Sequence, residues 1–160
     1  MTDREDRRLD LVVYGATSFV GQILCRHLVQ RHGTDGTLRW AIAGRDRAKL
    51  AAVAADTGAT VEQLIADATD RPALDDLVGA AKVVVSTVGP YALYGSELVA
   101  AAVAAGTDYC DLTGETQWMR QMIDAHQDGA TRSGARVVHT CGFDSIPHDL
   151  GALYAVQQLG

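Results

Sequence analysis

The feature that most constrains the fold is an apolar run, residues 11–14, that ends in Gly15. A second glycine, Gly21, follows six residues later, and after it apolar residues recur at helical spacing. Gly15 allows a sharp bend where a strand ends, and Gly21 lets a helix pack close to that strand. The stretch therefore predicts a strand, a tight turn and a helix.

The predicted turn has the properties of a phosphate site. Its middle residues Ala16, Thr17 and Ser18 are small, so the backbone can approach a ligand. The first N–H groups of a helix have no partner within the helix, and the helix dipole favours an anion there. An ordinary strand–helix corner with a glycine on each side is the alternative, and the turn alone leaves both open. Thr17 and Ser18 also stand where common dinucleotide fingerprints have glycine.

The length and charge of the chain argue for a single globular domain and against a nucleic-acid-binding or membrane-spanning protein. The chain has 160 residues, enough for one domain with a real core, and a formal charge of −6, which argues against a nucleic-acid surface. No apolar run is long enough to span a bilayer. Residues 1–8 are mostly charged, so we expect a disordered lead-in rather than a signal peptide.

The cysteines and histidines indicate no metal or disulfide framework. Cys25, Cys110 and Cys141 are odd in number and far apart in the sequence, which favours free thiols in a reducing cytoplasm. The five histidines show no metal-ligand spacing with them. We therefore expect no metal site, and packing or surface roles for these residues.

Strands and helices alternate along the whole chain. Strands are predicted over residues 11–14, 38–43, 61–66, 82–87, 107–111 and 135–140, and helices over 20–33, 48–56, 70–79, 97–105, 115–131 and from 150 onward. This alternation predicts an α/β fold with a doubly wound, mostly parallel sheet of about six strands and helices on both faces. The β-branched run at 82–87 suggests a central strand buried on both faces.

In such a fold the residues that follow the strands line one crevice, where ligands bind. Arg45 follows the second strand, where an acidic residue would favour NAD by accepting from the ribose hydroxyls. Arginine instead suits a 2′-phosphate, so we predict NADP(H). The alternative is that Arg45 caps the next helix or pairs with Asp46.

Other strand ends complete the predicted cofactor site. Asp67 and Ala68 stand where adenine is held, with a helix cap as the alternative for Asp67. Residues 88–91 would lie near the nicotinamide. Tyr91 either stacks against that ring or borders its site, or it packs in the core. The predicted cofactor-binding residues are Gly15, Ala16, Thr17, Ser18, Phe19, Val20, Gly21, Arg45, Asp67, Ala68, Val88, Gly89, Pro90 and Tyr91.

The helix predicted over 115–131 carries an apolar face of Trp118, Met119, Met122 and Ile123. Core contact is the expected role of such a face. If a further domain normally covers it, the face would be bare in this chain, and we expect self-association as a homo-oligomer.

Five segments together resemble the saccharopine dehydrogenase-like oxidoreductases, and within them the mycobacterial trans-acting enoyl reductases. They are residues 14–21 (YGATSFVG), 43–45 (AGR), 86–91 (STVGPY), 106–115 (GTDYCDLTGE) and 141–151 (CGFDSIPHDLG). The resemblance spans residues 9–151 and implies a Rossmann domain that binds NADPH over residues 9–147. It also implies that residues 148–160 begin a helix leading to a missing C-terminal substrate domain. Ser18 departs from the commoner glycine of the family's turn.

The resemblance further implies the chemistry, which is hydride transfer from NADPH to a C=C bond of a polyketide-type acyl chain. The acyl substrate would be a small molecule or bound to a carrier. The alternatives are a C=N oxidoreductase of amino-acid metabolism and a non-catalytic NADP(H)-binding regulatory module. Tyr91 and His148 are the candidates for the proton donor, although His148 stands at a helix start where capping is an alternative. We expect a cytoplasmic protein without a transmembrane segment, with peripheral association to a membrane as a further possibility.

Overall fold

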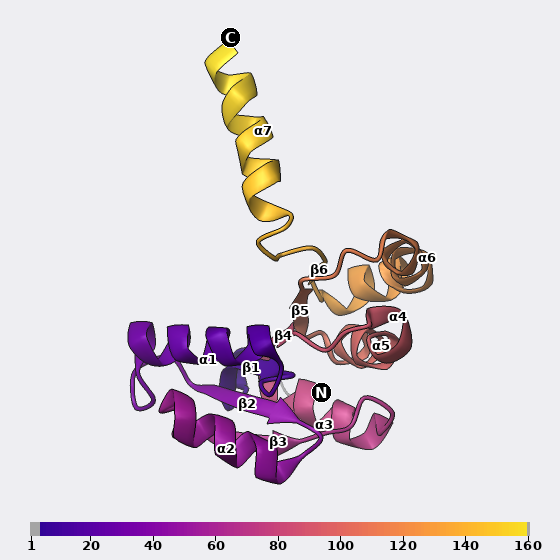
Figure 1. Ribbon diagram of the computed structural model, residues 1–160. Helices are drawn as coiled ribbons and strands as arrows, with labels where there is room; N and C mark the ends of the chain where they lie inside the picture. The colour runs from indigo at the N-terminus through magenta and orange to yellow at the C-terminus, as the bar shows by residue number, and fades with distance from the viewer. Residues whose placement is uncertain (1–3, 160) are drawn as a thin grey trace.

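The computed structural model describes residues 4–159, which fold around one six-stranded sheet (Figure 1). The strands are β1 (Leu9–Tyr14), β2 (Trp40–Gly44), β3 (Glu62–Ile65), β4 (Ala81–Ser86), β5 (Asp108–Asp111) and β6 (Val137–Val138). Their order is β3-β2-β1-β4-β5-β6, and every pair is parallel. The chain therefore winds outward in both directions from β1 and β4, which confirms the doubly wound parallel sheet.

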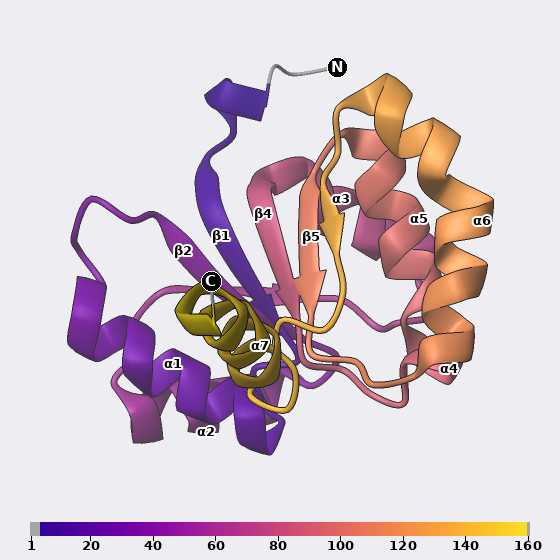
Figure 2. The same ribbon diagram turned by 90° about the horizontal axis from the view of Figure 1, so that it is seen from above.

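Helices lie on both faces of this sheet. They are α1 (Phe19–His32), α2 (Arg47–Thr57), α3 (Arg71–Ala80), α4 (Tyr91–Tyr94), α5 (Ser96–Ala105), α6 (Thr116–Ser133) and α7 (Ile146–Leu159). Figure 2 shows α1 and α2 on one face, and α3, α5 and α6 on the other. The short helix α4 was not predicted, and β6 is shorter than the strand expected over 135–140.

The helix starts follow from local hydrogen bonds that the sequence encodes. Ser18, Asp46 and Asp70 are the N-cap residues of α1, α2 and α3, and each side chain accepts a hydrogen bond from a backbone N–H in the first turn. Such caps satisfy donors that a helix leaves open. Asp46 caps α2 and does not lie within ion-pair distance of the Arg45 guanidinium, so the alternative that pairs these two residues is wrong.

The core consists of two layers, one on each face of the sheet. Trp118 and Met122 of α6 are buried in the larger layer, as predicted for core contacts. This result removes the reason given for self-association, since only Ile123 of that face is substantially exposed, at 45%. A homo-oligomer remains a prediction without that support.

One half of the sheet is open on the α1 side. Val84 of β4 is fully buried, but Val83 and Val85 are half-buried, so the expectation that this strand is buried on both faces is wrong. The reason is that α1 and α2 cover β1 to β3 on this face, and no helix of the described chain covers β4 to β6 there (Figure 2). Helix α7 extends away from the sheet instead, and all its residues are exposed (Figure 1).

The start of the chain is more ordered than expected. Residues 1–3 of the predicted lead-in lie outside the described residues, but Arg4–Asp6 form a 3-10 turn. Arg7 is 5% exposed, and its guanidinium donates to the carbonyl oxygen of Ala81 (2.6 Å), to Thr107 Oγ1 (2.5 Å) and to the carbonyl oxygen of Ala105 (2.5 Å). For residues 4–8 the disordered lead-in is thus a wrong prediction. Within 4–159, no helix combines the length and apolarity that crossing a bilayer requires.

Candidate functional site

A cavity of about 260 Å³ lies at the carboxyl ends of β1 to β4. This is the edge where doubly wound sheets bind ligands, at the point where strand order reverses between β1 and β4. We call it the crevice. It is lined by Tyr14, Gly15, Thr17, Ser18, Gly44, Arg45, Asp67, Ala68, Thr87, Val88, Gly89 and Tyr94.

Two glycines shape the turn between β1 and α1. Gly15 has φ +86°, and a Cβ there would lie 2.6 Å from Val88 Cγ2 and 2.7 Å from Thr87 Oγ1. A Cβ on Gly21 would lie 2.3 Å from the carbonyl oxygen of Gly15. The predicted roles of both glycines are confirmed, because a side chain at either position would push the turn apart or fill the crevice.

A chain of hydroxyl groups braces the turn against β4. Thr87 Oγ1 donates to the carbonyl oxygen of Gly15 at 2.9 Å and lies 2.9 Å from Ser18 Oγ. Ser18 Oγ also accepts from the N–H of Gly21 at 2.9 Å. With φ of −70°, Ser18 needs no left-handed conformation, so its departure from the commoner glycine causes no backbone strain here.

Arg45 is the crevice's cationic residue and is exposed at the end of β2. No carboxylate of residues 4–159 lies within ion-pair distance of its guanidinium. Its five N–H donors are therefore available to an anionic ligand, which a planar guanidinium binds in a bidentate manner.

Asp67 lies opposite, after β3. Its Oδ1 accepts from the N–H of Thr69 (2.9 Å) and from the Thr69 hydroxyl (2.8 Å), and these hydrogen bonds hold the pKa of the carboxyl below its ordinary value, with Arg45 contributing. The carboxylate is thus fixed in place and ionised. Asp70, not Asp67, caps α3, so the capping alternative for Asp67 is wrong.

Four residues that line the crevice are absent from the predicted cofactor-binding set: Tyr14, Gly44, Thr87 and Tyr94. Tyr14 and Thr87 are the last residues of the strands predicted over 11–14 and 82–87, and the side chains at a strand's end can face the crevice. Burial raises the pKa of the Tyr14 hydroxyl to about 12, so it stays protonated and is a hydrogen-bond donor. Tyr94 belongs to α4, a helix of only one turn, which is too short for a periodic pattern of apolar residues to predict.

Six predicted cofactor residues are not among those that line the crevice: Ala16, Phe19, Val20, Gly21, Pro90 and Tyr91. Ala16 is fully buried beneath the turn, and Phe19 is 80% exposed at the start of α1. Val20 faces a different cavity, described below. Gly21 shapes the turn without lining it.

Tyr91 belongs to the core. It is 5% exposed, its ring lies 5.4 Å from that of Trp118, and its hydroxyl donates to the carbonyl oxygen of Ser86 at 2.9 Å. Burial raises its pKa to about 12. Its N–H donates to Glu115 Oε1 at 2.6 Å, so the residue fastens the loop after β4 to the start of α6. Tyr91 therefore packs in the core, which is the alternative stated for it, and does not border the crevice.

His148 lies apart from the crevice, in the first turn of α7, and is exposed. Its N–H donates to the carbonyl oxygen of Ser145 at 3.1 Å. Neither proton-donor candidate therefore lines the crevice.

A larger cavity of about 560 Å³ adjoins the crevice, because Thr87 lines both. We call it the apolar cavity. It occupies the open half of the sheet beside α1 and is lined by Val20, Ile23, Leu24, His27, Val85, Thr87, Cys110, Asp111, Leu112, Thr113, Gly114, Cys141, Gly142, Phe143, Asp144 and Ser145. Its mainly apolar walls, and Phe143 at 85% exposure, suit an apolar ligand.

Cys110 and Cys141, far apart in the sequence, face this same cavity as free thiols. Burial raises the pKa of Cys110 to about 12 and also raises that of Cys141, so both thiols stay protonated. Among residues 4–159, no three His, Cys, Asp or Glu side chains gather as metal ligands would.

Comparison with known proteins identifies the family to which the sequence is similar. Residues 11–138 match the family model described as the saccharopine dehydrogenase NADP binding domain. A trans-acting enoyl reductase of Mycobacterium leprae is 44% identical over 149 residues, which are 91% of this chain and 35% of that protein. Its counterpart in Mycobacterium ulcerans is 45% identical over 147 residues, 90% of this chain and 34% of that protein. The chain thus spans about a third of the length of these relatives.

Solved structures share the fold. Saccharopine dehydrogenase (L-Glu forming) from Saccharomyces cerevisiae superimposes with a TM-score of 0.76 at 21% identity, over 94% of this chain and 31% of that one. Leucoanthocyanidin reductase from Vitis vinifera, solved as a complex with NADPH, gives a TM-score of 0.57 at 18% identity, over 81% and 48% of the two chains.

Proposed function

Because the chain belongs to the saccharopine dehydrogenase NADP-binding domain family, we propose that it holds NADP(H) in the crevice for the reduction of a C=C bond in an acyl chain. In this proposal the chain is the cofactor-binding part of an NADPH-dependent enoyl reductase. The relatives named trans-acting enoyl reductase support the reaction class.

The observation that carries the proposal is the position of Arg45. Across the crevice from the phosphate-binding turn at Gly15, it offers an unpaired cation where the 2′-phosphate of NADPH would lie. The residues fit the cofactor in two further ways. Gly15 has the positive φ of +86° that the sharp turn toward the phosphate site needs, and the N-terminus of α1 carries no acidic residue in its first turn.

Each residue has a binding or orienting role in this proposal. The N–H groups at the start of α1 bind the pyrophosphate, Arg45 binds the 2′-phosphate, and Asp67 accepts from the adenine amine. Val88 and Gly89 lie beside the nicotinamide, on the side toward the apolar cavity. NADPH supplies the hydride when bound, and the chain contributes orientation and electrostatics. Neither Tyr91 nor His148 is carried into the proposal as the proton donor.

The apolar cavity favours the enoyl reductase over an amino-acid C=N oxidoreductase. A charged amino-acid substrate would need paired charges, whereas most of the lining surface of this cavity is apolar and includes Val20, Val85 and Leu112. An aliphatic chain, free or bound to a carrier, would bury apolar surface there. We also propose that the protein is cytoplasmic and meets lipid substrates at a membrane surface, where exposed apolar side chains such as Phe19 and Phe143 could contact them.

The test is a titration with NADPH and NADH, followed by nicotinamide fluorescence. Arg45→Ala should weaken NADPH binding by about 10- to 100-fold and NADH binding far less, because a charge-assisted contact to the 2′-phosphate is lost. The matched control is Arg47→Ala, since Arg47 is exposed two residues later and does not line the crevice. Equal losses for both cofactors would exclude the role assigned to Arg45.

A further inference from the structure

Two free cysteines that are far apart in the sequence meet in the wall of the apolar cavity. Cys110 lies in β5 and is half-buried, and Cys141 follows β6 and is exposed. Both line this cavity, and neither lines the crevice. The proposed function uses the apolar walls of the cavity and assigns no role to the two thiols.

The backbone holds the two cysteines on neighbouring strands of the sheet. Cys110 pairs in register with Val138 of β6. The N–H of Cys141 donates to the carbonyl oxygen of Asp111, the residue after Cys110, at 2.7 Å. The thiol of Cys141 lies 3.5 Å from the carbonyl oxygen of Val138. Cys141 is therefore held beside Cys110 by both its backbone and its side chain.

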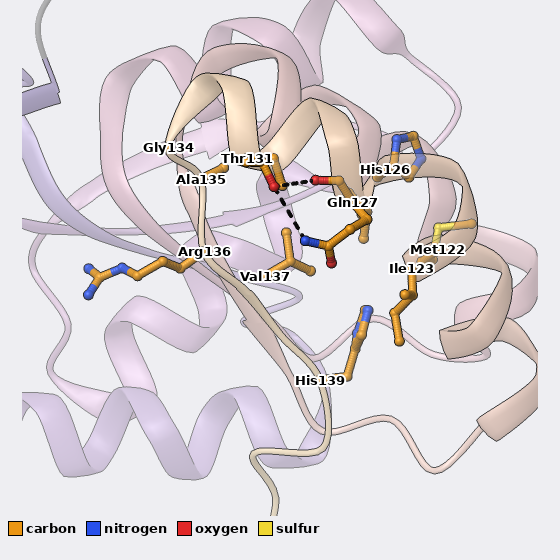
Figure 3. Close-up of a pocket in the computed structure, with 12 residues that line it drawn as sticks. Met122, Ile123, His126, Gln127, Thr131, Gly134, Ala135, Arg136, Val137 and His139 are labelled. Carbon is orange, nitrogen blue, oxygen red and sulfur yellow. Dashed lines mark hydrogen bonds between the residues drawn. The ribbon is translucent and has the colours of Figure 1, made fainter.

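The direction of Cys141 depends on an unusual backbone conformation at Thr140. Val137 and His139 both extend into a third cavity, of about 450 Å³, which lies between α6 and β6 on the other face of the sheet (Figure 3). Side chains alternate between the two faces of an extended strand, so Cys141 would face the same way as these two residues if the strand continued. Thr140 instead has φ +60°, in the left-handed region. The chain turns there, and Cys141 reaches the apolar cavity.

The left-handed conformation of Thr140 is costly, because a β-branched residue rarely adopts it. Two hydrogen bonds hold it in place. The N–H of Thr140 donates to Oδ1 of Asp111 at 3.1 Å, and its hydroxyl donates to the carbonyl oxygen of His139 at 2.7 Å. Strained backbone of this kind gathers at functional sites. Here its effect is to bring the second thiol to the first.

The two thiols lie within reach of each other. Burial raises the pKa of both, and a hydrogen bond between the two side chains adds to this shift for Cys110 and opposes it for Cys141. A disulfide needs Cα atoms about 4.4 to 6.8 Å apart, and neighbouring strands lie about 4.8 Å apart. The strand spacing falls within that range, so the pair can be bridged with little movement of the backbone.

The difference in exposure sets the order in which the two thiols react. A reagent in solution meets the exposed Cys141 first, and the half-buried Cys110 is then placed to attack the sulfur of Cys141. Cys25, the chain's third cysteine, is fully buried in the core layer beneath α1 and does not line the cavity. It is therefore an internal reference that should not react.

We propose that Cys110 and Cys141 form a redox-active dithiol, which a low-molecular-weight disulfide oxidises to an intramolecular disulfide. The sulfur of Cys141 attacks the external disulfide RSSR, forms a mixed disulfide and releases one RSH. The sulfur of Cys110 then attacks the sulfur of Cys141 and releases the second RSH. The two cysteines lose two electrons and two protons, and RSSR takes up both to become two RSH molecules.

The product would crosslink β5 to the segment that follows β6, in the wall of the apolar cavity. The inference does not depend on the proposed function, since neither a nucleotide nor an acyl ligand takes part in the exchange.

The test is incubation of the folded chain with glutathione disulfide, followed by alkylation with iodoacetamide and mass spectrometry of the intact chain and its peptides. Because both thiols are protonated at neutral pH, the exchange is slow and is followed over hours. We expect a chain lighter by two hydrogen atoms, in which the peptides of Cys110 and Cys141 are joined and Cys25 is still a thiol. A lasting mixed disulfide on Cys141, disulfides between separate chains, or no reaction at large excess would each overturn the proposal.

Two variants assign the steps to the two thiols. Cys110→Ser should accumulate the mixed disulfide on Cys141, because the thiol that resolves it is missing, and Cys141→Ser should form no crosslink. Cys141 is exposed, so its variant keeps the test valid even if the change at the half-buried Cys110 prevents folding. Cys25→Ala is the matched control and should form the crosslink as the parent does. Equal amounts of mixed disulfide in the parent and in a folded Cys110→Ser chain would exclude the role of Cys110.

Discussion

At the residue scale, the turn after β1 depends on the absence of a side chain at Gly21. A Cβ at this position would come within 3 Å of three backbone atoms of Gly15 and Ala16, at 2.3, 2.8 and 2.9 Å. Backbone atoms cannot rotate away as the end of a flexible side chain can. Helix α1 would therefore have to move away from the strand, and the N–H groups at its start would move with it.

We expect Gly21→Ala to lower the free energy of unfolding by about 1 to 3 kcal/mol, because overpacking forces the backbone to shift. It should also weaken NADPH binding. Gly151→Ala is the matched control, since Gly151 also lies in a helix but has no atom within 4 Å of an added Cβ. Urea unfolding of both variants provides the measurement, and equal stability of the two would contradict the predicted clash.

At the element scale, one side chain ties β1 to both of its neighbours. Asp10 of β1 accepts from the N–H of Arg39 at 3.0 Å and from its guanidinium at 2.9 Å, just before β2. It also pairs with Lys82 of β4 at 3.2 Å. These contacts, led by the hydrogen bond from the Arg39 side chain, hold the pKa of Asp10 well below its ordinary value.

The sign of this pKa shift gives a pH prediction. A carboxyl whose pKa is lower in the folded state adds stability above its unfolded pKa, about 3.9, and that stability is lost as the pH falls toward the folded pKa. Asp10→Asn should therefore be less stable than the parent at about pH 7, and the difference should shrink steadily below about pH 4. Urea unfolding across this range is the measurement. A difference that stays constant down to about pH 2 would show that Asp10 acts through packing rather than charge.

At the scale of the whole molecule, the domain is asymmetric. Helices α3, α5 and α6 lie along one face of the sheet, whereas α1 and α2 leave the other face open over β4 and β5, where the apolar cavity lies. Helix α7 does not close this opening, since every one of its residues is exposed. Its Leu150, Leu153 and Tyr154 are 54% to 65% exposed and add nothing to the core.

A chain shortened to end at residue 145 should therefore unfold with the same free energy as the parent, to within about 1 kcal/mol, because no buried surface is lost. Its affinity for NADPH should also be unchanged, since α7 contributes no residue to the crevice. Urea unfolding and cofactor titration of both chains provide the comparison. A clear loss of stability would mean that α7 packs on the domain in solution.

The sequence predicted the parts of the molecule that local rules control. The glycine turn and the alternating periodicities each depend on residues close together in the chain. The fold class follows from them, because alternating strands and helices with right-handed crossovers leave few arrangements. Arg45 could be placed in the crevice for the same reason, since the carboxyl ends of parallel strands meet at one edge.

The sequence alone therefore determined the doubly wound sheet, the glycine turn between β1 and α1 and the position of Arg45 at the crevice. Only the tertiary structure decided the burial of Tyr91 and Arg7, the open face beside β4, and the pairing of His139 with Asp111. These features depend on atoms that lie 28 residues apart in the case of His139 and Asp111, and about 100 apart in the case of Arg7 and Thr107. No local periodicity encodes such contacts, because they form only when strands and helices pack against one another.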